Sequence, residues 1–332
     1  MESDGVRVLV TGGAGYIGSH TAKALAEAGF EPVAYDNLSE GHRWAVQWGP
    51  LVDANLSDRT RLQETLQQYS IEAVIHFAAH AYVGESMREP RKYFQNNVTD
   101  ALALLDTLLD AGVRTFVFSS SCAVYGLPDA LPIAESALKQ PLNPYGESKL
   151  FMERALSWYA AAYGLHSACL RYFNAAGADA AGELGEVHRC ETHIIPLVVE
   201  SALGTRGPVE VFGTDYPTPD GTAVRDFVHV SDLADAHVLA LQRLLSEKKS
   251  FAVNLGTGRG VSVLEIIRAV ERQAGAVIPW QPGPRRPGDP PALVADASLA
   301  QSLLNWNPAR STLAEIVASA WRWHQRLPRV EA

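Results

Sequence analysis

Short apolar runs alternate with segments of helical periodicity along the first half of the chain. The apolar runs are rich in β-branched and aromatic residues and predict buried strands at 6–10, 32–35, 73–77, 115–119 and 167–172. Helical periodicity separates most of them, notably at 97–111 and 147–163, and a first helix is expected from 17 to 29. Apolar strands that alternate with helices are typical of a parallel, doubly wound sheet, so we predict an α/β fold.

The pattern changes after residue 174. Residues 175–222 and 280–291 are rich in Gly, Pro and Ala, which predicts loops around short elements. The length of 332 residues is near the upper limit for one hydrophobic core. Because an apolar run at 251–254 returns to the strand pattern, we predict a larger lobe and a smaller one: 1–174 plus 223–256, and 175–222 plus 257–332.

Further helices are expected at 232–245, 263–274 and 313–326. The last two begin with the spacing of a capping box, in which Ser262 precedes Glu265 and Thr312 precedes Glu315. In that motif the hydroxyl and the carboxylate each accept a backbone hydrogen bond at the start of the helix. The first residues of these two helices are therefore predicted more precisely than those of the other helices.

Composition and charge exclude several classes of function. The net charge is −9 and no basic stripe is present, which argues against a nucleic-acid partner. The first residues carry no positive charge followed by an apolar run, and no stretch is long enough to span a bilayer, so neither a signal peptide nor a membrane is expected. Cys122, Cys169 and Cys190 lack metal-ligand spacing and fit reduced thiols, so we expect a cytoplasmic protein without a metal.

Glycines recur at Gly12, Gly15 and Gly18, between the first strand and the first helix. At this point they allow a tight turn, close approach of the backbone to a pyrophosphate, and close packing of helix on sheet. Asp36 ends the second strand, where a carboxylate binds both ribose hydroxyls of NAD and repels the extra phosphate of NADP. A plain tight turn and a turn aspartate before Asn37 are the structural alternatives. Together the two features predict NAD as the cofactor.

Tyr145 and Lys149 lie at i and i+4 at the start of a helical pattern, so they share a face. Lowering the pKa of tyrosine from ~10 to ~7 requires about 4 kcal/mol, which the lysine and a nicotinamide ring would supply together. Ser121, after an apolar strand, is placed to donate to a substrate hydroxyl. The strand ends at Ala78 and Asn174 lie on the same predicted edge, where open parallel sheets bind ligands. Ser121, Tyr145 and Lys149 alone indicate hydride transfer beside NAD. The structural alternative is that Tyr145 and Lys149 lie on an ordinary exposed helix face.

These motifs resemble the extended short-chain dehydrogenase/reductase family, which has a Rossmann fold, and within it the UDP-glucose 4-epimerase family. The segments that carry the closer resemblance run in order along the chain: 83–86, 119–126, 170–174, 220–230 and 285–289. The resemblance implies reversible interconversion of UDP-glucose and UDP-galactose through a 4-keto intermediate and transient NADH. It implies that Tyr145 is the base for the sugar 4-hydroxyl, that Ser121 hydrogen-bonds the same oxygen, and that Lys149 lowers the tyrosine pKa and holds the nicotinamide ribose.

The resemblance also implies two sets of contact residues and a homodimer formed through 97–111 and 147–163. The cofactor set comprises Gly12, Gly15, Tyr16, Ile17, Gly18, Asp36, Asn37, Asn55, Leu56, Phe77, Ala78, Ala79, Asn97, Ser119, Tyr145, Lys149 and Tyr172. The substrate set comprises Ser121, Tyr145, Asn174, His193, Ile194, Phe212, Arg225, Arg286, Asp289 and Leu293. Arginines suit a diphosphate because the guanidinium group is planar and always charged.

The chain departs from the family pattern at several of these positions. Asn55 stands where an aspartate is common near the adenine, Ala81 replaces a lysine near the cofactor, and His193 replaces an asparagine. Leu293 occupies the position that controls the size of the sugar pocket, and its intermediate size leaves UDP-N-acetylglucosamine open as a substrate. Residues 81–86 resemble members that act on UDP-pentoses, so interconversion of UDP-xylose and UDP-arabinose also stays open.

Other functions are possible on the same fold. Sugar-nucleotide dehydratases show Thr-Asp-Glu where this chain has Ser121-Cys122-Ala123, so an acid/base pair for elimination is missing. An inactive NAD-sensing protein would lose Tyr145 or Lys149, yet both are present. A simple dehydrogenase would release NADH, whereas an epimerase would release none. We therefore favour an epimerase.

Overall fold

The computed structural model describes residues 5–286 and 288–326. The first four residues, on which part of the signal-peptide argument depends, lie outside the described residues, as do Pro287 of the 285–289 segment and residues 327–332. No helix within the described ranges is long and apolar enough to cross a membrane.

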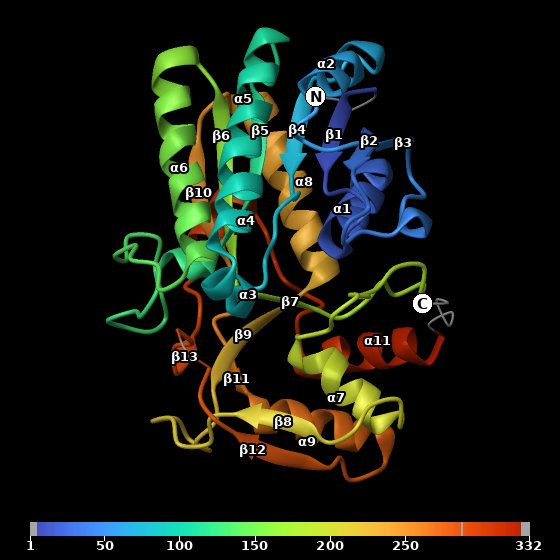
Figure 1. Ribbon diagram of the computed structural model, residues 1–332, viewed down its shortest axis with the longest axis vertical. Helices are drawn as coiled ribbons and strands as arrows, with labels where there is room; N and C mark the ends of the chain where they lie inside the picture. The colour runs from blue at the N-terminus through green and yellow to red at the C-terminus, as the bar shows by residue number, and fades with distance from the viewer. Residues whose placement is uncertain (1–4, 287, 327–332) are drawn as a thin grey trace.

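The larger lobe is built on a seven-stranded sheet in the order β10-β6-β5-β4-β1-β2-β3 (Figure 1). Every pairing in it is parallel, which confirms the predicted doubly wound sheet. The chain builds outward from β1 to β3 and then continues on the other side of β1 from β4, which creates a switch point between β1 and β4. The strands are β1 (Arg7–Thr11), β2 (Glu31–Asp36), β3 (Leu51–Asp53), β4 (Ala73–His76), β5 (Thr115–Ser121), β6 (His166–Tyr172) and β10 (Phe251–Leu255).

Helices cover both faces of this sheet, and each layer has its own apolar core. One core lies between the sheet and α1 (Tyr16–Glu27), α8 (Val230–Glu247) and α10 (Ser298–Leu304). The other core lies under α2 (Arg59–Gln68), α5 (Ala101–Asp110) and α6 (Pro144–Tyr163). Shorter helical segments complete this lobe: η1 (Arg43–Ala45), α3 (Val83–Arg88), α4 (Pro90–Phe94), η2 (Gln95–Asp100) and η3 (Cys122–Val124).

The smaller lobe lies beyond the carboxyl ends of the parallel strands (Figure 1). It contains two small sheets, made of β7 (Asn174–Ala176), β9 (Val224–His229), β11 (Gly260–Ser262) and β13 (Ala292–Leu293), and of β8 (Val209–Phe212) with β12 (Trp280–Gly283). A third core joins these strands to α7 (Ile194–Ala202), α9 (Val263–Ala274) and α11 (Leu313–Arg326). The lobe thus has its own apolar interior.

Two elements lie in the lobe opposite to the one expected from sequence. Residues 224–229 were expected to return to the large sheet, but β9 pairs with β7, β11 and β13. These partner strands are very short and lie in or beside Gly- and Pro-rich segments, so the apolar pattern did not show them. Residues 298–304 were expected in the smaller lobe, but α10 packs on β10 and α8 through Ala300 and Leu304.

Candidate functional site

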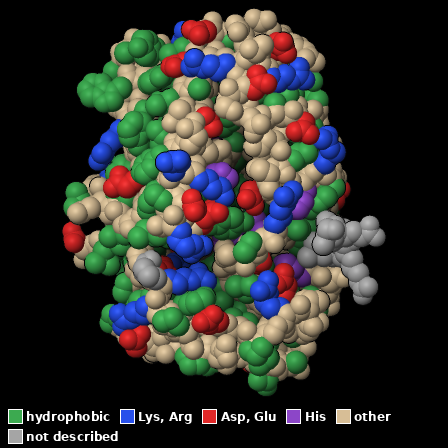
Figure 2. All heavy atoms as spheres, in the orientation of Figure 1, with side chains coloured by type: hydrophobic (Ala, Val, Ile, Leu, Met, Phe, Trp, Pro, Cys, Tyr) green, Lys and Arg blue, Asp and Glu red, His purple; other side chains and the backbone are tan. Residues whose placement is uncertain are grey.

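A cleft of about 1150 Å³ runs along the carboxyl ends of the parallel strands and into the smaller lobe. The carboxyl edge of an open parallel sheet, at its switch point, is where such folds bind ligands. In Figure 2, Lys, Arg and His side chains gather over the middle of the molecule, at the level where the lobes meet. The cleft is slightly larger than pockets for single small molecules, which reach about 1,000 Å³, so it can hold a large ligand.

The glycine loop lies at one end of the cleft, and its shape forbids side chains at two positions. Gly12 has a φ of +72°, and a Cβ there would lie 2.7 Å from the backbone nitrogen of Ala78. A Cβ on Gly18 would lie 2.1 Å from the carbonyl oxygen of Gly12. Helix α1 starts directly after Gly15 without a side-chain cap, so its first N–H groups remain available to a pyrophosphate. The loop therefore fits the diphosphate of NAD.

Asp36 ends β2 and lies beside this loop. Its carboxylate accepts hydrogen bonds from the backbone N–H of Ala14 at 3.0 Å and of Leu38 at 2.8 Å. Burial raises the pKa of Asp36 above its usual value, while these two hydrogen bonds act in the opposite direction. Nearby, Asn37 donates its side-chain amide to Asn55 Oδ1 at 2.7 Å. These polar groups form the end of the cleft that suits an adenosine.

Tyr145 and Lys149 lie on the first turns of α6, and Ser121 is the last residue of β5. Asn143 caps α6 by accepting a hydrogen bond from the N–H of Gly146 at 2.9 Å, which fixes where the helix begins. The Lys149 Nζ atom donates to the carbonyl oxygen of Ser119 at 2.8 Å. The sequence prediction that Tyr145 and Lys149 share one helix is thus confirmed.

Burial dominates the electrostatics of this pair. Burial raises the pKa of Tyr145 well above 10, and a hydrogen bond with Ser121 offsets part of that rise. Burial also lowers the pKa of Lys149 to about 7. Because the Lys149 Nζ atom lies 5.9 Å from the centre of the Tyr145 ring, the lysine alone does not make the tyrosine a base. A second positive charge nearby, such as the nicotinamide ring expected from sequence, would favour the phenolate further.

The smaller lobe brings two guanidinium groups to the opposite end of the cleft. Arg225 on β9 donates to the carbonyl oxygen of Val224 at 2.7 Å and forms an ion pair with Asp289. Arg286 lies over the ring of Phe212, with 4.2 Å between the guanidinium carbon and the ring centre. Burial lowers the pKa of Arg286, although a guanidinium group stays charged at neutral pH. Both cations are held in place for an anionic ligand such as a diphosphate.

The structure brings nearly all the predicted site residues to this one cleft. The exceptions within the described chain are Asn97, Ser119 and Lys149, which are buried behind its wall. The side chain of Asn97 holds the loop after β4, because it accepts from the N–H of His80 and donates to its carbonyl oxygen, both at 2.9 Å. The Ser119 hydroxyl lies 2.5 Å from the hydroxyl of Tyr172. Leu293 lines the cleft and packs in a small apolar cluster with Phe173.

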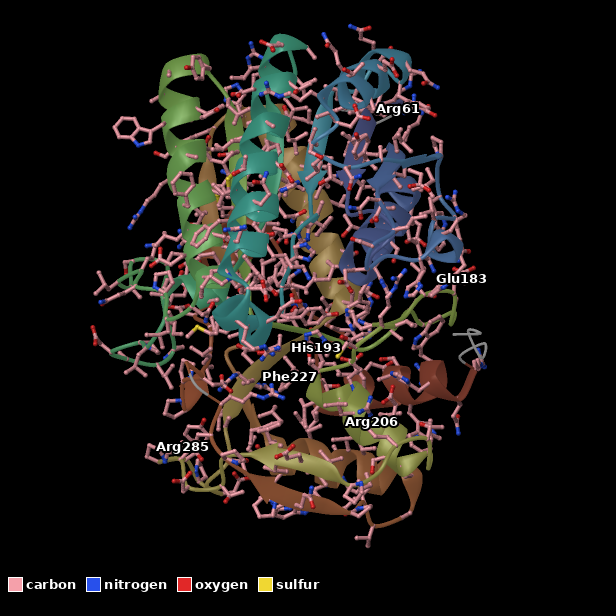
Figure 3. All side chains as sticks on the ribbon, in the orientation of Figure 1. Arg61, Glu183, His193, Arg206, Phe227 and Arg285 are labelled. Atoms are coloured by element: carbon pink, nitrogen blue, oxygen red, sulfur yellow. The ribbon has the colours of Figure 1, made fainter. Side chains whose placement is uncertain are left out.

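The cleft also contains polar side chains that sequence reasoning missed. Glu186 and His188 line it together with the predicted substrate contact His193, and Glu191 lies beside these three side chains. Figure 3 shows His193 at the level where the lobes meet. Burial lowers the pKa of His193, but the charges of Glu186 and Glu191 raise it by more, to about 10. The signal in the sequence is a repeated Glu-x-His tripeptide before an apolar helix.

The fold and the geometry of the cleft define a short-chain dehydrogenase/reductase whose second lobe supplies cations to a second ligand. The model of the NAD dependent epimerase/dehydratase family matches residues 8–256, and the chain belongs to this family. It is therefore an NAD-dependent enzyme.

Relatives with names and solved structures are similar over nearly the whole chain. The UDP-glucose 4-epimerase of Rhizobium meliloti (strain 1021) is 51% identical over 319 residues, which are 96% of this chain and 97% of the relative. The UDP-glucose 4-epimerase from Brucella ovis in complex with NAD is 52% identical, with a TM-score of 0.93 and coverage of 96% and 98%. A UDP-glucose-4-epimerase from Stenotrophomonas maltophila, solved with NAD and formylated UDP-arabinopyranose, is 44% identical, with the same TM-score and coverage.

Proposed function

We propose that this enzyme interconverts UDP-glucose and UDP-galactose by inverting carbon 4 of the hexose. The observation that carries the proposal is that Tyr145 and Ser121 share one cleft with the glycine loop and with Arg225 and Arg286. A nucleotide sugar whose diphosphate lies at the two arginines would direct its hexose toward Tyr145. The similarity to UDP-glucose 4-epimerases over nearly the whole chain supports the same substrate.

In the proposed mechanism the Tyr145 phenolate removes the proton of the sugar 4-hydroxyl, and Ser121 hydrogen-bonds the same oxygen. NAD, when bound, would accept the hydride of carbon 4. It would return the hydride after the 4-keto sugar has rotated to present its opposite face. The Tyr145 hydroxyl then gives its proton back to the oxygen, so no electron or proton is lost over the cycle. Lys149 would contribute positive charge next to the phenolate and hold the nicotinamide ribose.

This mechanism requires that the UDP part of the substrate is bound firmly while the sugar is bound weakly enough to rotate. The substrate set proposed from sequence provides both kinds of contact. Arg225 and Arg286 would hold the diphosphate, with Asp289 fixing Arg225. By contrast, Leu293 and Phe173 present apolar surface at the sugar end, where few hydrogen bonds would oppose rotation of the ring. Ser121-Cys122-Ala123 supplies no acid for elimination, so a dehydratase stays the less favoured function.

UDP-xylose and UDP-arabinose form a second substrate pair that a specific observation favours. Residues 81–86 resemble members that act on UDP-pentoses. The similar structure from Stenotrophomonas maltophila was solved with a formylated UDP-arabinopyranose. UDP-N-acetylglucosamine is a third substrate to test, because Leu293 is intermediate in size between residues that exclude and admit the N-acetyl group.

The proposal also includes the compartment of the enzyme, its oligomeric state and the lobe that binds each ligand. We place it in the cytoplasm as a homodimer, with NAD bound mainly by the larger lobe and the UDP-sugar mainly by the smaller lobe, which includes Arg225 on β9. The reduced-thiol pattern of its cysteines supports the compartment.

The test is to incubate the purified protein, without added NAD, separately with UDP-galactose, UDP-N-acetylgalactosamine and UDP-xylose, and then to identify the products. We expect conversion of UDP-galactose to UDP-glucose, at a higher kcat/KM than for the other two, and no net NADH. Preferred turnover of UDP-xylose would move the assignment to pentoses. If no sugar is epimerised even after NAD is supplied, the proposed function is wrong.

A further inference from the structure

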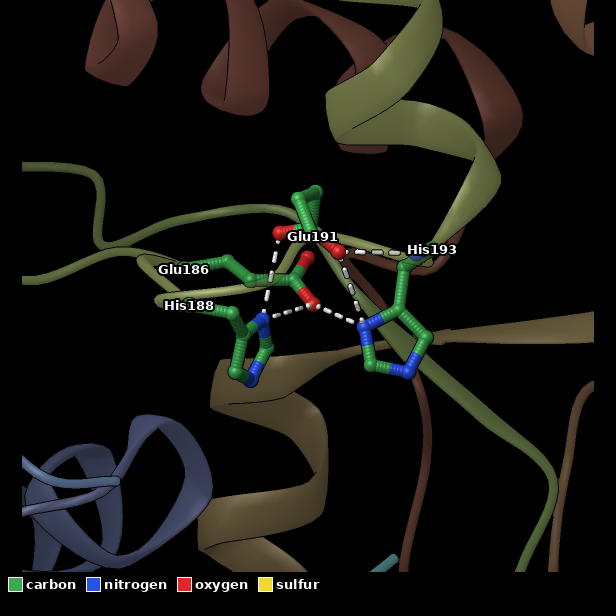
Figure 4. Close-up of side chains that lie close together, drawn as sticks. All are labelled: Glu186, His188, Glu191 and His193. Atoms are coloured by element: carbon green, nitrogen blue, oxygen red, sulfur yellow. Dashed lines mark hydrogen bonds and ion pairs between the residues drawn. The ribbon is translucent and has the colours of Figure 1, made fainter. Parts of the chain in front are cut away.

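Four side chains of the segment between β7 and α7 converge in the wall of the cleft, and we call them the Glu–His cluster: Glu186, His188, Glu191 and His193 (Figure 4). One ligand atom from each residue lies within 4.8 Å of all the others. Both histidines contribute Nδ1, and both glutamates a carboxylate oxygen. No metal was expected from the sequence, because its cysteines lack metal-ligand spacing.

The separations of these atoms match a small coordination shell. The His188 Nδ1 atom lies 3.5 Å from Glu186 Oε1 and 3.1 Å from Glu191 Oε2. The His193 Nδ1 atom lies 2.7 Å from Glu186 Oε1 and 3.4 Å from Glu191 Oε1. Two ligands that each lie 2.0–2.1 Å from a tetrahedral Zn²⁺ ion are about 3.3 Å apart. The four His–Glu separations thus lie close to that value, and no two ligand atoms of the cluster are more than 4.8 Å apart.

The burial of Glu186 supplies a second, independent indication. Glu186 is only 4% exposed, and its Oε1 atom has no hydrogen-bond partner within the described residues. Its short contact with His193 Nδ1 is therefore an ion pair without the geometry of a hydrogen bond. This buried carboxylate oxygen thus has ion-pair contacts with the two histidines but no hydrogen bond, and a bound metal ion would take the place of the histidine protons as its partner.

Glu191 is held in position by the backbone. Its Oε1 atom accepts hydrogen bonds from the N–H groups of Thr192 at 2.8 Å and of His193 at 2.7 Å. Its Oε2 atom lies beside His188 Nδ1 at 3.1 Å. Preorganised ligands of this kind lose little entropy when they bind an ion.

We propose that the Glu–His cluster binds one divalent first-row transition-metal ion through two imidazole nitrogens and two carboxylate oxygens. This mixture of nitrogen and oxygen ligands suits Zn²⁺ and Co²⁺, whereas Mg²⁺ prefers oxygen ligands and keeps its waters. The proposal does not depend on the epimerase function, because it concerns binding of the metal alone.

The test uses the full chain without a polyhistidine tag, treated with a chelator and dialysed. It is titrated with Co²⁺, followed by its visible absorption, and Zn²⁺ is then used as a competitor. We expect one Co²⁺ per chain, displaced by an equal amount of Zn²⁺ and unaffected by an excess of Mg²⁺.

His188→Gln and Glu191→Gln identify the ligands, and circular dichroism checks their folding. The new amide oxygen in Glu191→Gln can still accept the two backbone hydrogen bonds, so this variant should fold. Each variant should weaken binding more than about 10-fold, a loss seen even when only the partner of a ligand is removed. His80→Gln, a cleft histidine outside the cluster, is the matched control and should bind like the wild type. Absence of saturable binding, binding that requires UDP, or equal binding by the folded His188→Gln variant would each overturn the proposal.

Discussion

At the scale of single residues, the surroundings of Lys149 determine how readily it carries a positive charge. Its Nζ atom donates to the carbonyl oxygen of Ser119 at 2.8 Å and lies 5.0 Å from the centre of the Phe118 ring. Both contacts favour the ammonium form, but burial is stronger and lowers the pKa of Lys149 to about 7. In the proposed mechanism, the lysine would therefore assist a tyrosine base together with a second positive charge, the nicotinamide ring.

The first prediction concerns the proposed base. Tyr145→Phe should lower kcat about 10²–10⁴-fold, the usual contribution of a general acid–base group, while NAD stays bound. The reason is that the ring still fills its buried position, but no group remains to take the proton from the sugar. Steady-state kinetics with UDP-galactose and the NAD content of the purified variant measure the two effects.

Tyr159→Phe is the control for that substitution. Tyr159 lies on the same helix, and its hydroxyl donates to Asp106 Oδ1 at 2.7 Å, away from the cleft. This variant should keep the wild-type kcat. A Tyr145→Phe variant with turnover near the wild type would remove Tyr145 as the base.

At the scale of elements, the turn from β1 into α1 gives the second prediction. Gly18→Ala would place a Cβ 2.1 Å from the carbonyl oxygen of Gly12, which is backbone and cannot move away cheaply. We expect the loop to shift, NAD affinity to fall more than about 10-fold, and stability to fall by about 1–3 kcal/mol, the usual cost of overpacking. Titration with NAD and urea denaturation measure these changes.

Gly207→Ala is the matched control, because a Cβ at Gly207 meets nothing within 4 Å. It should bind NAD like the wild type. If Gly18→Ala also retained the wild-type affinity, the close approach of α1 to the loop would not be what shapes the pyrophosphate site.

Sequence patterns predicted the elements whose local signals agree with their tertiary role. The Ser262–Glu265 pair forms the expected capping box and starts α9 at Val263, and the Thr312 hydroxyl accepts from the N–H of Glu315 as predicted for α11. By contrast, α7 lies in a segment that was predicted as loops around short elements, and its helix of mostly apolar residues, Ile194–Ala202, was not predicted. Its neighbours in sequence are rich in Gly and Pro, and this composition obscured a helix that packing stabilises.

Sequence patterns likewise predicted only part of the candidate site. The residues at the carboxyl ends of β1, β2, β4, β5 and β6 could be placed together because parallel strands share one edge. Arg225 and Arg286 could be paired only through family resemblance, since β9 and the segment after β12 have no common local pattern. The Glu–His cluster was missed because its four side chains converge through a loop, whose conformation no periodicity describes.

At the scale of the whole molecule, buried histidines make stability depend on pH. Burial lowers the pKa of His20, His229 and His237 from 6.5 to about 4, and that of His76 to about 3. Below pH 6.5 the unfolded chain therefore binds protons at these residues that the folded protein does not bind. Each lowered pKa thus removes stability as the pH falls from 6.5 toward 4, by at most about 1.4 kcal/mol per pH unit.

The third prediction isolates one of these groups. His237→Phe should make the loss of stability between pH 6.5 and 5 about 1.5 kcal/mol smaller than in the wild type, since the slope rises from about half of 1.4 kcal/mol per pH unit at pH 6.5 to nearly that value at pH 5. Urea denaturation of NAD-saturated protein at several pH values measures it. The phenyl ring can keep the packing against Phe77, whose ring centre lies 4.7 Å away. Identical pH dependence in both proteins would show that His237 is protonated in the folded state.

The fourth prediction concerns assembly. Large apolar side chains are exposed on α6, where Phe151 is 48%, Trp158 75% and Tyr163 58% exposed, and Figure 2 shows hydrophobic side chains along that edge. A soluble protein rarely exposes such a set unless a partner covers it. We therefore expect α6 to contribute to the homodimer, with Trp158 near its centre because large aromatic residues dominate interface energies.

Trp158→Glu should then weaken the dimer by about 30-fold or more in Kd, which corresponds to a loss of about 2 kcal/mol at an interface hot spot. Size-exclusion chromatography with light scattering over a dilution series measures the fraction of dimer. Leu299→Glu, an exposed apolar residue on α10, is the control and should behave like the wild type. Because Tyr145 and Lys149 begin the same helix, a monomeric Trp158→Glu variant with normal kcat would show that α6 is positioned by the core of its own subunit. A variant that stays dimeric at every dilution would place the interface elsewhere.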